Sequence, residues 1–481
     1  MADWARLLSE CRGLNLGRGF ESRPPRLTRD TPTRRVFCSS ACYSHLLMAY
    51  TIQQQDIAIS ARGGHITTQA LSVTSKVEEL LAHFTARWWA TGTSLPSLGP
   101  ALSPAEQRVR EKHLGQFTGT LLHQVKHPPR TPGERQALLN QVGPQVSEFL
   151  KGAFGMADRQ IEAIRTYRFI EAASEFARQA TQFDPTISTD DVFQACRNVW
   201  SMNLMQLLFG LPVQVTPAVF AYSMLYPYTD NYLDDPDVST ETKHAFNQRF
   251  RQRLDGQPVA PANDHEQTIY KLVGIIENAF ERPRYPQVYE SLLAIHKAQG
   301  RSLALQRGAV SPYEVDALGI CFEKGGTSTL ADAYLVAGEL TETQCEFAFY
   351  YGCVTQLVDD LEDVQSDAQS GIMTVFAQTA GRWPLDAITN RALLFSLEMV
   401  KSMEVFDTPG LDPLNQMLQI MLPPLFIDSI GRAGQFYSRP YLCEAQAHFP
   451  FRFDYLRQQR KKLNQRKAAW NGLMEAVISN L

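Results

Sequence analysis

Residues 198–237 read NVWSMNLMQLLFGLPVQVTPAVFAYSMLYPYTDNYLDDPD, and this stretch decides how the surrounding chain folds. Its first part, 198–229, contains no Asp, Glu, Lys, Arg or His, and an uncharged segment of that length is either buried or inserted in a membrane. Pro212 and Pro217 interrupt it, and polar side chains such as Gln206 lie within it. The segment therefore predicts two helices buried in a soluble core, because proline breaks a helix interior and polar side chains are unfavourable in lipid.

Aspartates follow this uncharged segment directly. Asp230 and Asp234 are four positions apart and share one face of a helix, whereas Pro236 disfavours a helical conformation at Asp235. The carboxylates thus gather at the C-terminal end of a helix, where the helix dipole is already negative. An acidic helix end of this kind is either a solvated turn or a site that binds cations.

A second acidic cluster ends another apolar segment, residues 344–367, which reads QCEFAFYYGCVTQLVDDLEDVQSD. Asp359, Asp363 and Asp367 recur every four positions, and Asp360 lies beside the first of them. On one helix these three residues form a stripe in which each pair of like charges repels by roughly 0.2–0.5 kcal/mol. Mg²⁺ is commonly held by one or two carboxylates together with phosphate oxygens. Two acidic helix ends that face each other across a cavity would therefore hold Mg²⁺ and a diphosphate.

A bound diphosphate also needs basic side chains around it. Lys324 is the strongest candidate, because it stands alone in a long apolar stretch and precedes the pair Gly325–Gly326, which would let a phosphate approach the backbone. Lys297 and Arg301 share one helix face, and Arg307 follows further along. That face is equally well explained as a solvated surface.

Aromatic residues precede both acidic clusters. They have two interpretations, as rings that line a cavity and stabilise a carbocation or as ordinary core residues. The candidates for the cavity are Phe209, Phe220, Tyr226, Phe349 and Tyr350.

Together these features resemble the class I isoprenoid (terpenoid) synthase superfamily, over residues 195–375. The sequence DNYLDD is similar to that family's first aspartate-rich motif, QLVDDLEDV is similar to the second, and EKGGTSTL is similar to its Lys-Thr element that binds diphosphate. The resemblance implies an all-α bundle around a central cavity, in which three Mg²⁺ ions bind a prenyl diphosphate substrate. It also implies that loss of the diphosphate leaves an allylic cation.

The resemblance assigns roles to the residues named above. The catalytic carboxylates would be Asp230, Asp234, Asp359 and Asp363. The Mg²⁺ ligands would be Asp230, Asp234, Asp235, Asp359, Asp360, Asp363 and Asp367. The diphosphate would contact Lys324, Arg301, Lys297 and Arg307.

Departures from the family's pattern decide between its members. Chain-elongating prenyl synthases carry a Gly-Lys-Arg element and an Arg-Arg-Gly element, and neither occurs in this chain. The first motif also begins Asp-Asn where those enzymes have Asp-Asp. We therefore expect a terpene synthase that forms a hydrocarbon or an alcohol. Two alternatives stay open, namely a prenyltransferase, chain-elongating or head-to-head, and a catalytically silent helical partner.

The chain has a break rich in proline and glycine near residues 126–135. We expect an N-terminal, partly helical extension over 1–140, with its first 35 residues disordered, and the catalytic bundle over 143–481. The basic stretch 451–470 is expected to be a solvated helix on the bundle, or else a peripheral contact with an anionic membrane surface.

Composition and charge limit the partners. The net charge of −4 gives no reason to expect a nucleic acid, and 44% hydrophobic with 20% charged residues is ordinary for a soluble globular chain. The eight cysteines form no CxxC pair, so we expect free thiols and a cytoplasmic location. We expect no transmembrane span, and a homodimer is compatible with these features.

Overall fold

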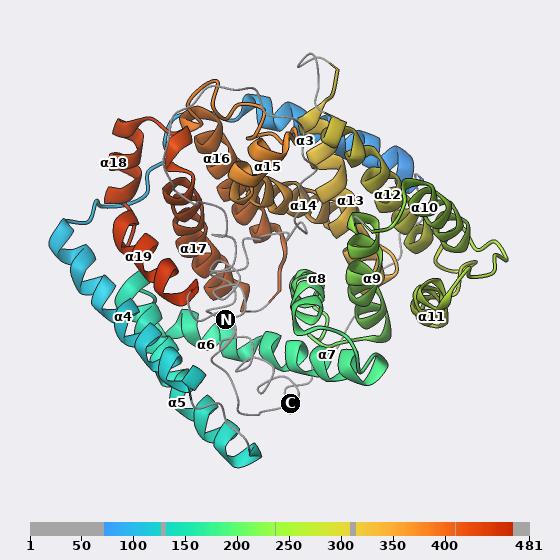
Figure 1. Ribbon diagram of the computed structural model, residues 1–481, viewed down its shortest axis with the longest axis horizontal. Helices are drawn as coiled ribbons and strands as arrows, with labels where there is room; N and C mark the ends of the chain where they lie inside the picture. The colour runs from blue at the N-terminus through green and yellow to red at the C-terminus, as the bar shows by residue number, and fades with distance from the viewer. Residues whose placement is uncertain (1–71, 127–130, 236, 308–313, 409, 465–481) are drawn as a thin grey trace, which may run out of the picture.

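The computed structural model describes residues 72–126, 131–235, 237–307, 314–408 and 410–464 (Figure 1). Every element among these residues is a helix, which confirms the predicted all-α class. The α-helices are α3 (Val73–Ala90), α4 (Pro104–Lys126), α5 (Pro132–Phe154), α6 (Asp158–Thr166), α7 (Phe169–Phe183), α8 (Thr189–Leu208), α9 (Pro217–Asp234), α10 (Thr240–Leu254), α11 (Asp264–Ala279), α12 (Pro286–Ser302), α13 (Ala317–Ala337), α14 (Glu342–Glu362), α15 (Val364–Ser370), α16 (Asp386–Ser402), α17 (Leu411–Arg432), α18 (Arg439–Ala447) and α19 (Phe453–Asn464). Three short 3-10 helices are η1 (Leu303–Arg307), η2 (Met403–Val405) and η3 (Gly434–Phe436).

The uncharged segment forms two helices, as the prolines predict. Helix α8 ends at Leu208, and α9 begins at Pro217 after a loop. The Thr216 side chain accepts a hydrogen bond from the Val219 backbone N–H, which caps the start of α9, and a proline in the first turn needs no hydrogen-bond partner. None of the described helices combines the length and the apolar character that crossing a bilayer requires.

Helix α13 lies at the centre of the bundle. It packs against α14, α12, α8, α3 and α9, and nearly all of its side chains are buried (Figure 1). A helix that is buried on nearly every face is typical of such a central position, where neighbouring helices take the place of solvent.

Helices α13 and α14 are antiparallel and approach each other closely where glycines face each other. A Cβ atom added at Gly352 would lie 2.1 Å from the Gly325 carbonyl oxygen, and one added at Gly325 would lie 2.1 Å from the Gly352 carbonyl oxygen. A Cβ at Gly326 would lie 2.5 Å from the Phe349 ring. The two glycines after Lys324 therefore make room for α14. Gly325 also lines a cavity, so the expectation that it lets a phosphate approach the backbone stays a prediction.

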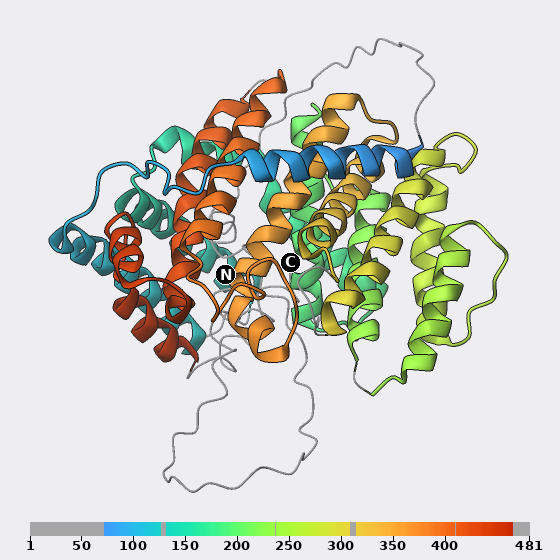
Figure 2. The same ribbon diagram turned by 90° about the horizontal axis from the view of Figure 1, so that it is seen from above.

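The N-terminal helix α3 is part of the same hydrophobic core. It runs across the bundle and contacts α13, α12 and α14 (Figure 2). Phe84 stacks on Tyr350 at 4.5 Å between ring centroids, and Trp88 meets Phe395 edge-on at 5.6 Å. The boundary expected near residue 140 falls inside α5, and one core cluster extends from Val73 to Leu456 across it. The structure thus shows no separate unit at that boundary, and the first 35 residues lie outside the described part of the chain.

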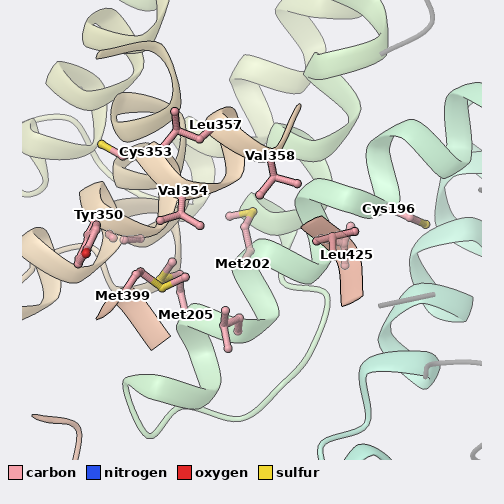
Figure 3. Packing of buried hydrophobic residues seen from close by; sticks show 14 of the residues in the cluster. Cys196, Met202, Met205, Tyr350, Cys353, Val354, Leu357, Val358, Met399 and Leu425 are labelled. Atoms are coloured by element: carbon pink, nitrogen blue, oxygen red, sulfur yellow. The ribbon is translucent and has the colours of Figure 1, made fainter. Parts of the chain in front are cut away.

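Aliphatic and sulfur-containing side chains fill the space between α8 and α14. Figure 3 shows Met202 and Met205 of α8 beside Val354 and Val358 of α14, with Leu425 of α17 next to them. All five are buried. This packing fixes the lateral position of α8 relative to α14, and both helices carry residues of the candidate site.

The basic stretch at the C-terminus begins as a helix, α19, that packs on α17. Arg460 forms an ion pair with the buried Asp428 of α17, whereas Lys461 and Lys462 are exposed. The helix therefore covers the bundle, as predicted, up to Asn464. The remainder of the stretch lies outside the described residues.

We predict that Gly352→Ala destabilises the protein, because its methyl group must force α13 and α14 apart. The loss in the free energy of unfolding is expected to be about 2 kcal/mol or more. Chemical denaturation measures it, with Gly274→Ala in α11 as the matched control. That position has no neighbouring atom within 4 Å of an added Cβ, so alanine there should stabilise by about 0.5–1 kcal/mol. Equal stability of the two variants would contradict the close approach.

Candidate ligand-binding site

A cavity of about 210 Å³ lies between α8, α9, α12, α13 and α14. Helices α8, α12, α13 and α14 each contribute side chains that are one or two turns apart and so share a face, and α9 contributes Tyr226. The lining residues are Gln194, Arg197, Asn198, Trp200, Ser201, Tyr226, Ile295, Gln299, Lys324, Gly325, Ser328, Thr329, Asp332, Tyr351, Thr355, Gln356 and Asp359.

The cavity has two ends, which are set by the antiparallel pair α13 and α14. Lys324 and Asp332 are eight residues apart on α13, so they are separated by about 12 Å along the helix. Asp359 of α14 lies near Lys324, and Tyr351, eight residues earlier on α14, lies near the charge of Asp332. We call these the Lys324 end and the Asp332 end.

Both predicted acidic clusters reach the Lys324 end. Asp359 lines the cavity itself. Asp230 accepts a hydrogen bond of 3.1 Å from the Gln299 side chain, and Gln299 lines the cavity from α12. The structure thus brings together two carboxylates that are far apart in the sequence. Among the described side chains, no group of three or more His, Cys, Asp or Glu is arranged to hold a metal ion. The side chain of Asp234 is not among those described.

Carboxylates of the second cluster crowd one another. The pKa of Asp360 is raised to about 7, chiefly by burial and to a smaller extent by the charges of Asp367 and Asp359. A hydrogen bond of 2.9 Å from Gln356 and the charge of Lys324 oppose this increase. Asp360 is buried behind the cavity wall and does not line the cavity. The crowding shows that this helix end favours additional positive charge.

The remaining aspartates of both clusters lie at helix ends. Asp235 caps α9 in an extended conformation, as Pro236 predicts, and its carboxylate accepts a hydrogen bond of 2.9 Å from the Asp237 backbone N–H. Asp363 caps α14 and leads directly into α15. The Asp367 N–H still donates to the Asp363 carbonyl at 2.9 Å, so the predicted spacing of the stripe is kept through the junction.

The predicted basic residues occupy different environments. Lys324 lines the cavity. Arg301 is half exposed and forms an ion pair with the buried Glu323, and Lys297 is exposed and does not line the cavity. The Arg307 side chain lies outside the described part of the structure. Arg197 of α8, which the sequence reasoning missed, lines the cavity instead. The sequence feature that could have identified Arg197 is its position as the last charged residue before the uncharged segment 198–229.

Of the predicted aromatic residues, Tyr226 lines the cavity and the others pack elsewhere. Phe349 and Tyr350 are buried on the α3 side of α14, and the Tyr350 hydroxyl donates to the Phe395 carbonyl at 2.7 Å. Phe220 packs against Phe176 and Phe183, and Phe209 packs against Phe406. These four therefore have the core role that the sequence left as the alternative.

The Asp332 end is formed by polar residues that the sequence reasoning missed. The Ser201 hydroxyl donates a hydrogen bond of 2.7 Å to Asp332 Oδ2. Burial outweighs the opposing effect of the Ser201 hydroxyl and the Asn198 amide, so the pKa of Asp332 is raised to about 7. The sequence did contain a signal for Asp332. Lys324, Ser328 and Asp332 follow one another at intervals of four residues and therefore share one face of a helix.

Compared with protein-family models, with curated proteins and with solved structures, the chain has no match. The site is therefore interpreted from its own residues. A cavity with carboxylates and an amine at one end, and a guanidinium in its wall, suits an anionic group bound together with cations. Its other end, with one buried carboxylate and tyrosines, suits an apolar or cationic group.

We predict that Asp332→Asn stabilises the protein at high pH. The pKa of Asp332 is about 7 in the folded chain and near its ordinary value of 3.8 when unfolded, so the folded state binds the proton more tightly. The free energy of unfolding of the wild type therefore falls as pH rises from about 4 to about 7. At pH 8 the variant should be more stable by about 4 kcal/mol, because a pKa difference of about three units corresponds to about 1.4 kcal/mol per unit, and the difference should vanish toward pH 4. Chemical denaturation across this range measures it, and a constant difference would contradict the assignment.

Proposed function

We propose that this protein is a Mg²⁺-dependent class I terpene synthase, which ionises an allylic prenyl diphosphate and releases diphosphate. One observation carries the proposal: the Lys324 end of a single cavity receives Asp359 directly and Asp230 through Gln299. The resemblance of both acidic motifs to that superfamily supports it.

The donor set at the Lys324 end fits Mg²⁺. Asp230, Asp359, Asp363 and Asp367 offer the carboxylate oxygens that this ion prefers, and Mg²⁺ usually takes only one or two carboxylates from the protein beside substrate phosphates. The mutual effect of the carboxylates on the pKa of Asp360 also favours added positive charge. When bound, Mg²⁺ would stabilise the negative charge that develops on the leaving diphosphate.

The chain's own residues would bind the diphosphate and protect the cation. Lys324 and Arg197 both line the cavity, and their side chains would donate hydrogen bonds to phosphate oxygens. The C–O bond of the substrate then breaks, and its electron pair leaves with the diphosphate. The Tyr226 ring lines the cavity and would stabilise the allylic cation.

A synthase is favoured over a prenyltransferase because the cavity offers one diphosphate site. Among the described residues that line it, the basic side chains are Arg197 and Lys324. Lys297 is exposed outside the cavity and Arg301 is paired with Glu323, so neither forms a second basic site in it. A transferase would have to bind the diphosphate of isopentenyl diphosphate as well.

We predict Mg²⁺-dependent release of diphosphate from one of the C10, C15, C20 or C25 allylic diphosphates. Asp230→Asn and Asp359→Asn should each lower the rate by at least about 100-fold, because charge on the leaving group is no longer stabilised. Product analysis by mass spectrometry, with a chelator in parallel, checks the reaction. Asp237→Asn is the control, since this exposed residue of the first cluster lies beyond the helix end.

The same assay separates the alternatives. Product that forms only when isopentenyl diphosphate is added would identify a prenyltransferase. Binding of diphosphate without any turnover would identify a catalytically silent partner. Full activity of both aspartate variants would refute the proposed site.

We further predict that the basic residues of the cavity, and not those on the outer face of α12, bind the anion. Lys324→Gln and Arg197→Gln should each weaken binding of inorganic diphosphate with Mg²⁺ by about tenfold or more, since a hydrogen bond to a charged group is lost. Lys297→Gln should change it less than about twofold, because its amine is solvated. Isothermal titration calorimetry gives the dissociation constants, and the reverse ranking would favour the α12 face.

A further inference from the structure

Asp332 is a buried acidic residue in the cavity wall that the proposed ionisation step does not use. It is 1% exposed, and Ser201 donates a hydrogen bond to its Oδ2 atom. By distance and angle its Oδ1 atom accepts no hydrogen bond from a described residue, although the Asn198 amide is near enough to lower the pKa of the carboxyl group. A buried carboxylate oxygen without a hydrogen-bond donor is destabilising. The presence of such an oxygen in a cavity wall indicates that it interacts with the molecule bound in the cavity.

The surroundings of Asp332 supply no countercharge. None of the ion pairs formed by the described residues includes Asp332. Its neighbours are the phenol rings of Tyr222 and Tyr351, and burial followed by the charge of Asp332 raises the pKa of both. Aromatic faces and a carboxylate both attract a cation, so this end of the cavity is arranged for a positive centre.

We propose that Asp332 is the base that ends the reaction, by accepting a proton from the carbon next to the cationic centre. This inference rests on the proposed function. The C–H bond breaks, its electron pair becomes the new C=C bond and removes the positive charge, and the proton joins Asp332 Oδ1. A neutral hydrocarbon results, and the carboxyl group returns its proton to water after the product has left.

Distance separates Asp332 from the other base in the cavity, the released diphosphate. Lys324, which would bind the diphosphate, lies two turns before Asp332 on α13, about 12 Å away along the helix. A positive charge that moves along the hydrocarbon toward the Asp332 end therefore meets this carboxylate first. With a pKa of about 7, the group exchanges a proton readily near neutral pH.

The test compares the products of the wild type with those of Asp332→Asn, which keeps the shape and removes the base. Diphosphate release should continue, but the share of hydrocarbon among the products should fall at least about tenfold, with alcohol formed instead when water captures the cation. Asp428→Asn is the matched control, because Asp428 is also a buried aspartate but is paired with Arg432 and Arg460 outside the cavity. Its hydrocarbon share should equal that of the wild type.

A second variant keeps the test independent of how Asp332→Asn folds. Asp332→Ala leaves a space in place of the carboxylate, and added acetate should restore the hydrocarbon share in that variant alone. Unchanged products in Asp332→Asn and Asp332→Ala would overturn the inference and leave the proposed function intact. Loss of diphosphate release in a folded Asp332→Asn would also overturn it, because the residue would then act in ionisation. Absence of release from the wild type would overturn the proposed function itself, and this inference with it.

Discussion

The contact between the backbones of α13 and α14 is the constraint on which the site depends. At Gly325 and Gly352 no side chain separates the two helices, and each glycine would place a Cβ atom on the other's carbonyl oxygen. Lys324 directly precedes the first glycine, and Asp359 lies two turns after the second. The close approach therefore puts an amine and a carboxylate on the same cavity wall, which wider helix spacing would separate.

The remaining helices complete this wall by burying apolar faces against it. Helix α3 closes one side of α13 and α14 with Phe84 and Trp88, while α8 and α9 close the other. Because these covering helices are apolar, the pKa values of the acidic groups buried behind them are strongly shifted. Asp332 and Asp360 both have a pKa raised to about 7 by burial. The fold tolerates this cost in stability at positions where a bound cation or a cationic intermediate would relieve it.

Much of the fold follows from local features of the sequence. Pro217 fixes the start of α9, Pro236 fixes its end, and the Thr341 capping box fixes the start of α14. The expected boundary near residue 140 falls inside α5, because a break in local patterning does not show which core the preceding helix joins. Helix α3 shares the core of α13 and α14 because Trp88 needs burial, and only the assembled bundle provides it.

The sequence by itself determined the all-α class, the end of α9 at Asp235, and the choice of Lys324 as a basic residue of the cavity. Only the tertiary structure decided that Arg197 faces the cavity while Arg301 is paired with Glu323, that Phe349 belongs to the core, and that Asp332 stands at the far end. The physical reason is that periodicity fixes which residues share one face of a helix. What that face meets is decided by the packing of helices that are distant in the chain.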